Sequence, residues 1–124
     1  MTKIRELSEA IRVNRIEEVE KLIKEGVNVN CNVIDKDKPL HLAALFGYTE
    51  VAQLLIQHNA YIEAKDKYRY TPLHTAAVCG CFEVVKLLIQ HNANIEAKNN
   101  IGETPLDLAK NAGHTEIIEL LIKT

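Results

Sequence analysis

The sequence lacks tryptophan, holds only two phenylalanines and four tyrosines, and has no long run of apolar residues. A helix that crosses a bilayer needs roughly 20 apolar residues, so we expect neither a membrane span nor an apolar signal core. A dominant charge is also missing, because 15 basic residues are interspersed with 17 acidic ones, for a net charge of −2. This balance argues against nucleic acid and anionic membranes as partners.

Cysteine is scarce and odd in number. Cys31, Cys79 and Cys81 cannot form a complete disulfide framework, and Cys79 and Cys81 are separated by a single residue. Such usage favours reduced thiols and a cytoplasmic location. The abundance of asparagine, isoleucine and lysine is typical of AT-rich genomes, which adds the hypothesis of an intracellular microbe whose protein acts in the host cytosol.

Proline and glycine are few but regularly placed. Consecutive prolines are 33 residues apart at Pro39, Pro72 and Pro105. Three glycines have the same spacing: Gly47, Gly80 and Gly113. Residues 35–67 and 68–100 are identical at 19 of 33 positions, residues 101–124 repeat the first two-thirds of the unit, and residues 4–34 repeat it loosely. The chain therefore holds four copies of one unit, which indicates a repeat architecture.

Each unit predicts a helix, a turn, a second helix and an extended hairpin. In the third copy Thr71 is a capping residue, Pro72 suits the first helical position, and Gly80 ends the helix. The second helix carries apolar residues at i, i+3 and i+4 spacing, which predicts one buried face at Val84, Leu87 and Leu88. Asparagine tolerates the left-handed conformation that follows a helix, so Asn59 and Asn92 are expected there, as Gly26 is in the first copy.

Two short helices cannot bury an apolar face alone, so neighbouring copies must stack. The outer copies carry polar residues where the inner ones are apolar. Glu9, Glu18 and Lys21 replace Leu42, Val51 and Leu54, and Lys110 replaces Ala44 and Ala77. We therefore expect a complete four-repeat domain over residues 1–124, with caps at 1–34 and 101–124 and inner repeats at 35–67 and 68–100.

A known family shares this pattern. Three segments carry T-P-L-H-x-A or a close variant of it at the 33-residue period: KPLHLAALFGYTEVAQLLIQHNAYIEA, TPLHTAAVCGCFEVVKLLIQHNANIEA and ETPLDLAKNAGHTEIIELLIK. The sequence thus resembles the ankyrin-repeat family over nearly its whole length. The resemblance implies an all-α solenoid of four helix-turn-helix repeats with β-hairpin loops projecting from one side, and a function in protein recognition.

The chain departs from the family pattern in its second and third copies. The turn glycine present at Gly102 is replaced by Lys36 and Arg69, and the threonine before the proline is replaced by Lys38. Because lysine has no side-chain oxygen, the first helix of the second repeat is expected to be poorly capped.

Candidate chemical groups have structural explanations. The resemblance implies that His41 and His74, at equivalent positions, make hydrogen bonds between turns. Cys81 and His114 also hold equivalent positions, but together with Cys79 they lack the spacing of a zinc site. No nucleophile has a recognisable base and orienting partner, and no phosphate-binding glycine loop is present. We expect no enzymatic activity, no cofactor and no metal.

The family resemblance implies a partner-binding groove lined by the hairpins and the first helices. By alignment these positions are Asp35, Asp37, Leu45, Phe46, Lys67, Tyr68, Tyr70, Val78, Cys79, Ile101 and Glu103. Many are apolar, and Phe46, Tyr68 and Tyr70 are the candidate anchors for another protein, although packing between hairpins is the alternative for these three. A monomeric adaptor or inhibitor is the favoured function, and a homo-oligomer that pairs through the same face is the alternative.

Overall fold

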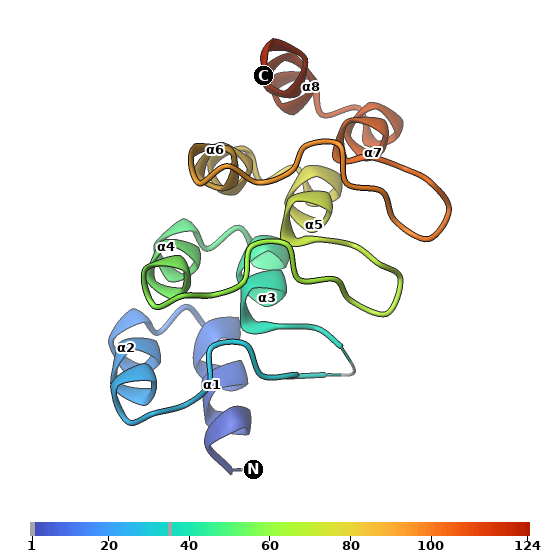
Figure 1. Cartoon of the computed structure of the whole chain (residues 1–124). Coiled ribbons are helices and arrows are strands. Elements are labelled where there is room, and N and C mark those ends of the chain that lie inside the picture. The colour runs from blue at the N-terminus through green and yellow to red at the C-terminus, as the bar shows by residue number, and fades with distance from the viewer. Residues whose placement is uncertain (1, 35) are drawn as a thin grey trace.

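The computed structural model describes residues 2–34 and 36–124 and shows a stack of helix pairs (Figure 1). The described residues form eight helices: α1 (Thr2–Arg12), α2 (Ile16–Lys24), α3 (Pro39–Phe46), α4 (Thr49–Gln57), α5 (Pro72–Cys79), α6 (Phe82–Gln90), α7 (Pro105–Ala112) and α8 (Thr115–Lys123). Within these residues the loops form no continuous strand, and an isolated antiparallel bridge joins Ile34 to Asp37. The all-α repeat fold expected from the sequence is confirmed.

Helices α3, α5 and α7 begin and end at the residues that the repeat pattern predicts. Proline occupies the first turn of each, and a glycine with φ between 72° and 78° follows each. Thr71 caps α5, because its hydroxyl oxygen accepts the backbone N–H of His74 at 3.3 Å. Each of these inner helices is therefore held to eight residues by local chemistry.

The cap of α3 is incomplete, as the sequence predicts. Lys38 provides no side-chain cap, and only the reciprocal bond is present, in which the backbone N–H of Lys38 donates to His41 Nδ1 at 3.1 Å. The Lys38 ammonium instead donates to Asn32 Oδ1 at 2.6 Å. One N–H in the first turn of α3 is thus left without the acceptor that threonine supplies in the next two repeats.

The second helix of each inner repeat buries the predicted face. Val84, Leu87 and Leu88 of α6 are all buried. Asn59 and Asn92 adopt φ values of 73° and 66°, which confirms that asparagine takes the left-handed position after α4 and α6.

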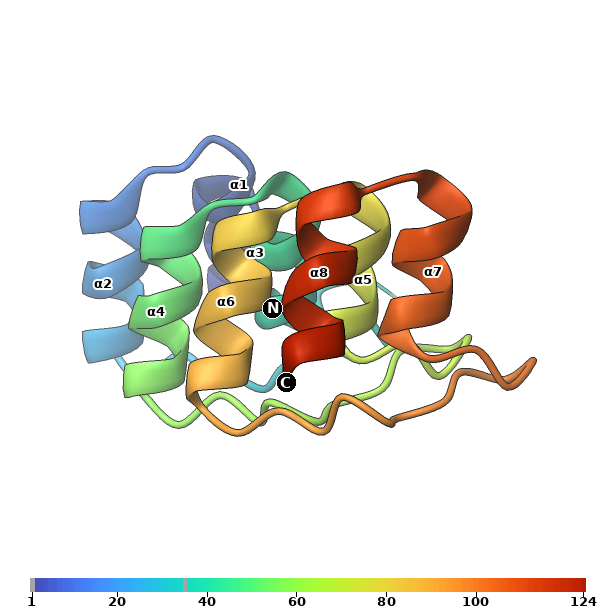
Figure 2. The same ribbon diagram turned by 90° about the horizontal axis from the view of Figure 1, so that it is seen from above.

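Helices α1, α3, α5 and α7 pack in one row, the inner row, and α2, α4, α6 and α8 pack in a second, outer row beside it (Figure 2). The inner row is joined by fully buried alanines: Ala43, Ala44, Ala76, Ala77 and Ala109. Small side chains let helix axes approach closely, so the inner row stacks more tightly than the leucine-rich outer row. The core is a continuous apolar layer between the two rows.

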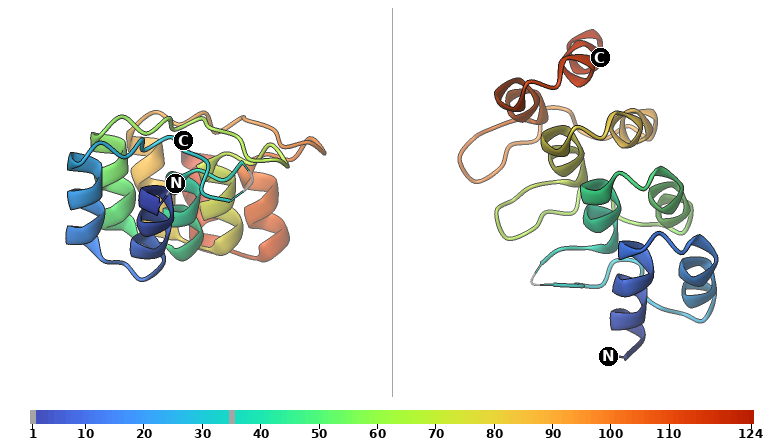
Figure 3. Two further views of the ribbon diagram at one scale, coloured as in Figure 1. Left: turned by 90° about the horizontal axis from the view of Figure 1, so that it is seen from below. Right: turned by 180° about the vertical axis from the view of Figure 1, so that it is seen from behind.

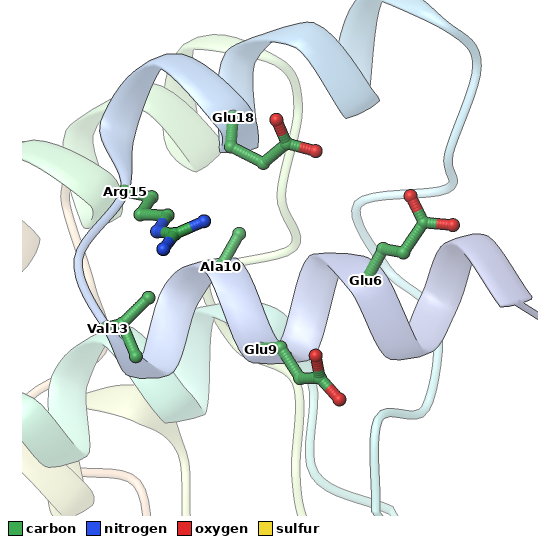
Figure 4. A pocket seen from close by; sticks show the side chains of 6 residues that line it. All are labelled: Glu6, Glu9, Ala10, Val13, Arg15 and Glu18. Atoms are coloured by element: carbon green, nitrogen blue, oxygen red, sulfur yellow. The ribbon is translucent and has the colours of Figure 1, made fainter.

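The two ends of the stack differ. At the α1–α2 end, an open depression of about 350 Å³ occurs where a preceding repeat would stack. Figure 4 shows that Arg15 and Glu18 lie on either side of Ala10, that Glu6 stands farther along α1, and that Glu9 points away from Arg15. At the α7–α8 end Lys110 is exposed, as predicted, but Ile122 is also 63% exposed. Both ends therefore also expose an apolar side chain, since Val13 lines the first depression and is 61% exposed.

Two glycines provide a matched test of packing at the turns. Gly80 and Gly113 have φ values of 75° and 78°, but a Cβ on Gly80 would lie 2.7 Å from His114 Cε1, whereas one on Gly113 would meet nothing within 4 Å. We expect Gly113→Ala to cost roughly 1–2 kcal/mol from backbone strain and Gly80→Ala about 1–3 kcal/mol more from overpacking. Urea unfolding of both variants measures the difference. Equal losses would mean that the His114 ring moves aside at no cost.

Candidate functional site

The predicted groove residues lie on the inner helices and on the loops that project beyond them, along one edge of the stack (Figure 3). Leu45 and Phe46 are at the end of α3, and Val78 and Cys79 are at the end of α5. The others are in the loops before α3, α5 and α7. Asp35 lies outside the described residues.

Several of these side chains are exposed apolar groups. Leu45 is 46% exposed, Phe46 43%, Tyr68 54% and Ile101 73%. The Phe46 ring stacks on Tyr48, with a centroid distance of 5.6 Å, and the ammonium of Lys67 lies 5.2 Å from the centroid of Tyr68. These contacts restrict both rings, and both side chains remain exposed.

Other predicted positions are less accessible. Tyr70 is half-buried, with its ring centroid 5.5 Å from that of His74, so packing accounts for much of this side chain. Asp37, Val78 and Glu103 are also half-buried. Cys79 and Lys67 are exposed. Of the three candidate anchors, Phe46 and Tyr68 are therefore the ones that a partner can reach most fully.

In each of the loops before α5 and α7, one polar side chain accepts two hydrogen bonds from the backbone of its own loop. Asp66 Oδ1 accepts the backbone N–H groups of Tyr68 and Tyr70, both at 2.9 Å. Asn99 Oδ1 does the same for Ile101 and Glu103, at 3.1 and 2.9 Å. The polar side chain thus faces its own backbone, and the apolar residue at the tip is directed outward.

Adjacent loops are joined to each other through histidine. His74 Nδ1 accepts the backbone N–H of Thr71 at 3.1 Å, and its Nε2 is 2.9 Å from the carbonyl oxygen of Glu103 in the next loop, to which it donates. His41 makes the equivalent bond to the carbonyl of Tyr70 at 2.9 Å. The structural role expected for both histidines is confirmed, and each also joins one repeat to the next.

Burial of His74 should make the stability of the protein depend on pH. Removal from water lowers the pKa of His74 below its ordinary value of 6.5, because the imidazolium cannot be solvated there. Below about pH 6.5 the unfolded chain binds a proton that the folded chain does not, so stability should fall as the pH drops toward the folded-state pKa. Urea unfolding at several pH values measures this slope. We expect His74→Gln to reduce the slope and His91→Gln, at an exposed site, to preserve it. An unchanged slope in His74→Gln would contradict the assignment of the pH dependence to His74.

Cys81 and His114 both have hydrogen-bond partners within the stack. Burial raises the pKa of the Cys81 thiol, which disfavours the thiolate that a metal needs, and His114 Nε2 donates to the carbonyl of Val78 at 3.0 Å. Among the described residues no three potential ligands converge. No helix in the described part of the chain combines the length and apolar character needed to cross a lipid bilayer.

Comparison with known families accounts for this architecture. A model of three ankyrin-repeat copies matches residues 7–99, and a single ankyrin-repeat model matches residues 101–124. The chain belongs to the ankyrin-repeat family. Ankyrin repeats are generally modules for protein–protein interaction and are not enzymes as a class.

A relative among curated proteins shares part of this ankyrin-repeat chain. Potassium channel KOR2 of Oryza sativa subsp. japonica is 40% identical over 65 residues, which make up 52% of this chain. The similarity covers only 9% of the length of the channel, so the chain matches a small segment of that protein.

Three exposed residues were missed by the transfer of family positions. Tyr61 is 63% exposed in the turn after α4, where the neighbouring repeats have Asn28 and Asn94. Arg5 and Arg12 are exposed on α1, and Arg12 holds the repeat position of Leu45. The 33-residue alignment identifies Arg12 once the degenerate first repeat is included, whereas Arg5 and Tyr61 align with no predicted groove position.

Proposed function

We propose that this ankyrin-repeat chain binds a partner protein through the surface formed by its projecting loops and inner helices, and acts as an adaptor or inhibitor. The observation that carries the proposal is the exposure of Leu45, Phe46, Tyr68 and Ile101 on that one surface of a chain that has only six aromatic residues. Exposed apolar clusters with a polar rim are typical of interfaces.

Rigidity adds to the suitability of this surface. The loops are braced internally by Asp66 and Asn99 and are linked by the histidine bonds, so little ordering is required when a partner binds. A standard interface buries about 800 Å² on each side and takes most of its affinity from a few central aromatic residues. Phe46 and Tyr68 meet that description.

Affinity capture with matched variants tests the proposal. The test variant carries Phe46→Ala, Tyr68→Ala and Ile101→Ala, and Tyr70 is left intact because its ring packs on His74. The control variant carries Tyr61→Ala and Ile122→Ala, two side chains that are more exposed than Phe46 and Tyr68 but lie in the turn after α4 and on α8. Circular dichroism first establishes that both variants remain folded.

A protein captured by the wild type and the control but lost from the test variant would support binding through the loop surface. Retention by the test variant would reject that surface. Sedimentation velocity over a range of concentrations addresses self-association: a concentration-dependent dimer of the wild type that the test variant abolishes would replace the partner-binding proposal with a homo-oligomer.

A further inference from the structure

A pocket of about 470 Å³ lies between α1 and the loop that follows α2. Its lining residues are Ile4, Arg5, Ser8, Glu9, Arg12, Val33 and Ile34. It is separate from the depression at the α1–α2 end of the stack, since only Glu9 lines both. The predicted groove positions do not include any residue of this pocket.

Two arginines form the cationic part of the pocket. Arg5 and Arg12 are both exposed, and the ion pairs Lys3–Glu25 and Glu20–Lys24 involve neither of them. Arg12 follows Arg5 by seven positions, so the two arginines lie on the same face of α1 with Cα atoms about 10 Å apart along the helix. Each guanidinium can donate two hydrogen bonds to one carboxylate in a bidentate pair.

The remaining wall is mostly apolar. Ile4 and Val33 are half-buried and pack against the core, and Ile34 is exposed on the loop. Glu9 is the acid in the lining; it is exposed and lies on α1 between the two arginines, so the lining has one positive charge in excess. The pocket therefore offers an apolar surface beside two positive charges, a combination that suits an amphipathic ligand better than a simple anion.

The pocket continues the surface proposed for partner binding. Arg12 holds in the first repeat the position that Leu45 and Val78 hold in the second and third, so one strip along the inner helices changes from cationic to apolar. The outer helices have the opposite character, with seven glutamates and four lysines among them. The chain thus has a local positive surface despite its net charge of −2.

We propose that this pocket binds an acidic, partly apolar segment of a partner protein. Successive residues of an extended chain advance about 3.3 Å, so carboxylates three residues apart match the spacing of Arg5 and Arg12. An apolar side chain between them lies against Ile4 and Ile34, and the residues that follow run over Leu45 of α3. This assignment rests on the proposed function and adds the chemistry of the partner.

Binding of a short peptide tests the assignment directly. The probe is a fluorescein-labelled synthetic peptide of 12 residues. Two glutamates three residues apart flank a phenylalanine, and a leucine and a second phenylalanine, also three residues apart, follow them. Fluorescence anisotropy measures its Kd at low and high salt. Comparison probes replace both glutamates by glutamine, or are a single-stranded DNA of similar length.

Matched charge-reversal variants locate the site. The test variant is Arg5→Glu with Arg12→Glu, and the control is Lys21→Glu with Lys86→Glu, the same change in charge at exposed positions of α2 and α6. We expect the test variant to weaken peptide binding at least tenfold, the control to remain within twofold, and both the glutamine peptide and high salt to weaken binding.

Four results would overturn the assignment: no binding of the acidic peptide, equal binding of the glutamine peptide, unchanged binding by the arginine variant, or tighter binding of the DNA. The acidic-segment assignment and the general binding proposal can fail independently of each other. A partner lost from the Phe46, Tyr68 and Ile101 variant but retained by the arginine variant leaves the binding function intact and rejects only the acidic segment.

Discussion

Leu88→Ala is expected to lower the free energy of unfolding by about 2–5 kcal/mol, measured by urea denaturation. Leu88 is fully buried in α6, and its helix packs against α4 on one side and α8 on the other. Truncation opens a cavity in the layer that several repeats share. Because each repeat is stabilised mainly by its neighbours, the loss weakens the stack beyond the third repeat.

Ile122→Ala is the matched control for this prediction. Ile122 has a similar volume but is 63% exposed on α8, so the change should stay within about 0.5 kcal/mol. A small effect of Leu88→Ala, similar to that of the control, would contradict a continuous core. A separate early transition in Leu88→Ala would instead show that the repeats on either side unfold independently.

His74→Ala should cost roughly 3–5 kcal/mol, because it removes a fully buried side chain and leaves its hydrogen-bond partners without it. The backbone N–H of Thr71 loses its acceptor, and the carbonyl of Glu103 loses its donor in the adjacent repeat. The loss therefore combines a local capping term with a link between repeats. Urea unfolding measures the total.

Asp107→Ala isolates the capping part of this effect. Asp107 occupies the same repeat position, and its Oδ2 accepts the backbone N–H of Thr104 at 3.0 Å, but it is exposed and this bond stays within its own repeat. We expect a loss of about 1 kcal/mol, typical of a helix cap. If His74→Ala costs no more than Asp107→Ala, the bond to Glu103 does not stabilise the stack.

The sequence predicted the fold well because the repeat depends on local rules. The positions of Pro72, Gly80 and Asn92 follow from backbone preferences, and the buried face of α6 follows from the spacing of its apolar residues. Backbone preference and apolar spacing both act within a single repeat, so the sequence of one repeat is enough to predict its helices.

The candidate site was harder to predict because exposure depends on neighbouring repeats. Tyr68 and Tyr70 are two residues apart and equally aromatic, yet Tyr68 is exposed and Tyr70 packs on His74. The turn imposed by Asp66 decides which ring points outward, and its two hydrogen bonds cannot be inferred from composition. The pocket beside Arg5 was missed because the first repeat matches the unit only loosely.

The bond from each histidine to the next loop has an evolutionary consequence. A unit such as residues 68–100 contains both the donor for the following repeat, His74, and the acceptor for the preceding one, the carbonyl of Tyr70. Tandem duplication of this stretch in the gene would insert a repeat whose donor and acceptor both find partners. The protein can therefore lengthen by whole units without exposing an unpaired backbone group, and the identity of its two central copies at 19 of 33 positions is what a duplication followed by divergence would leave behind.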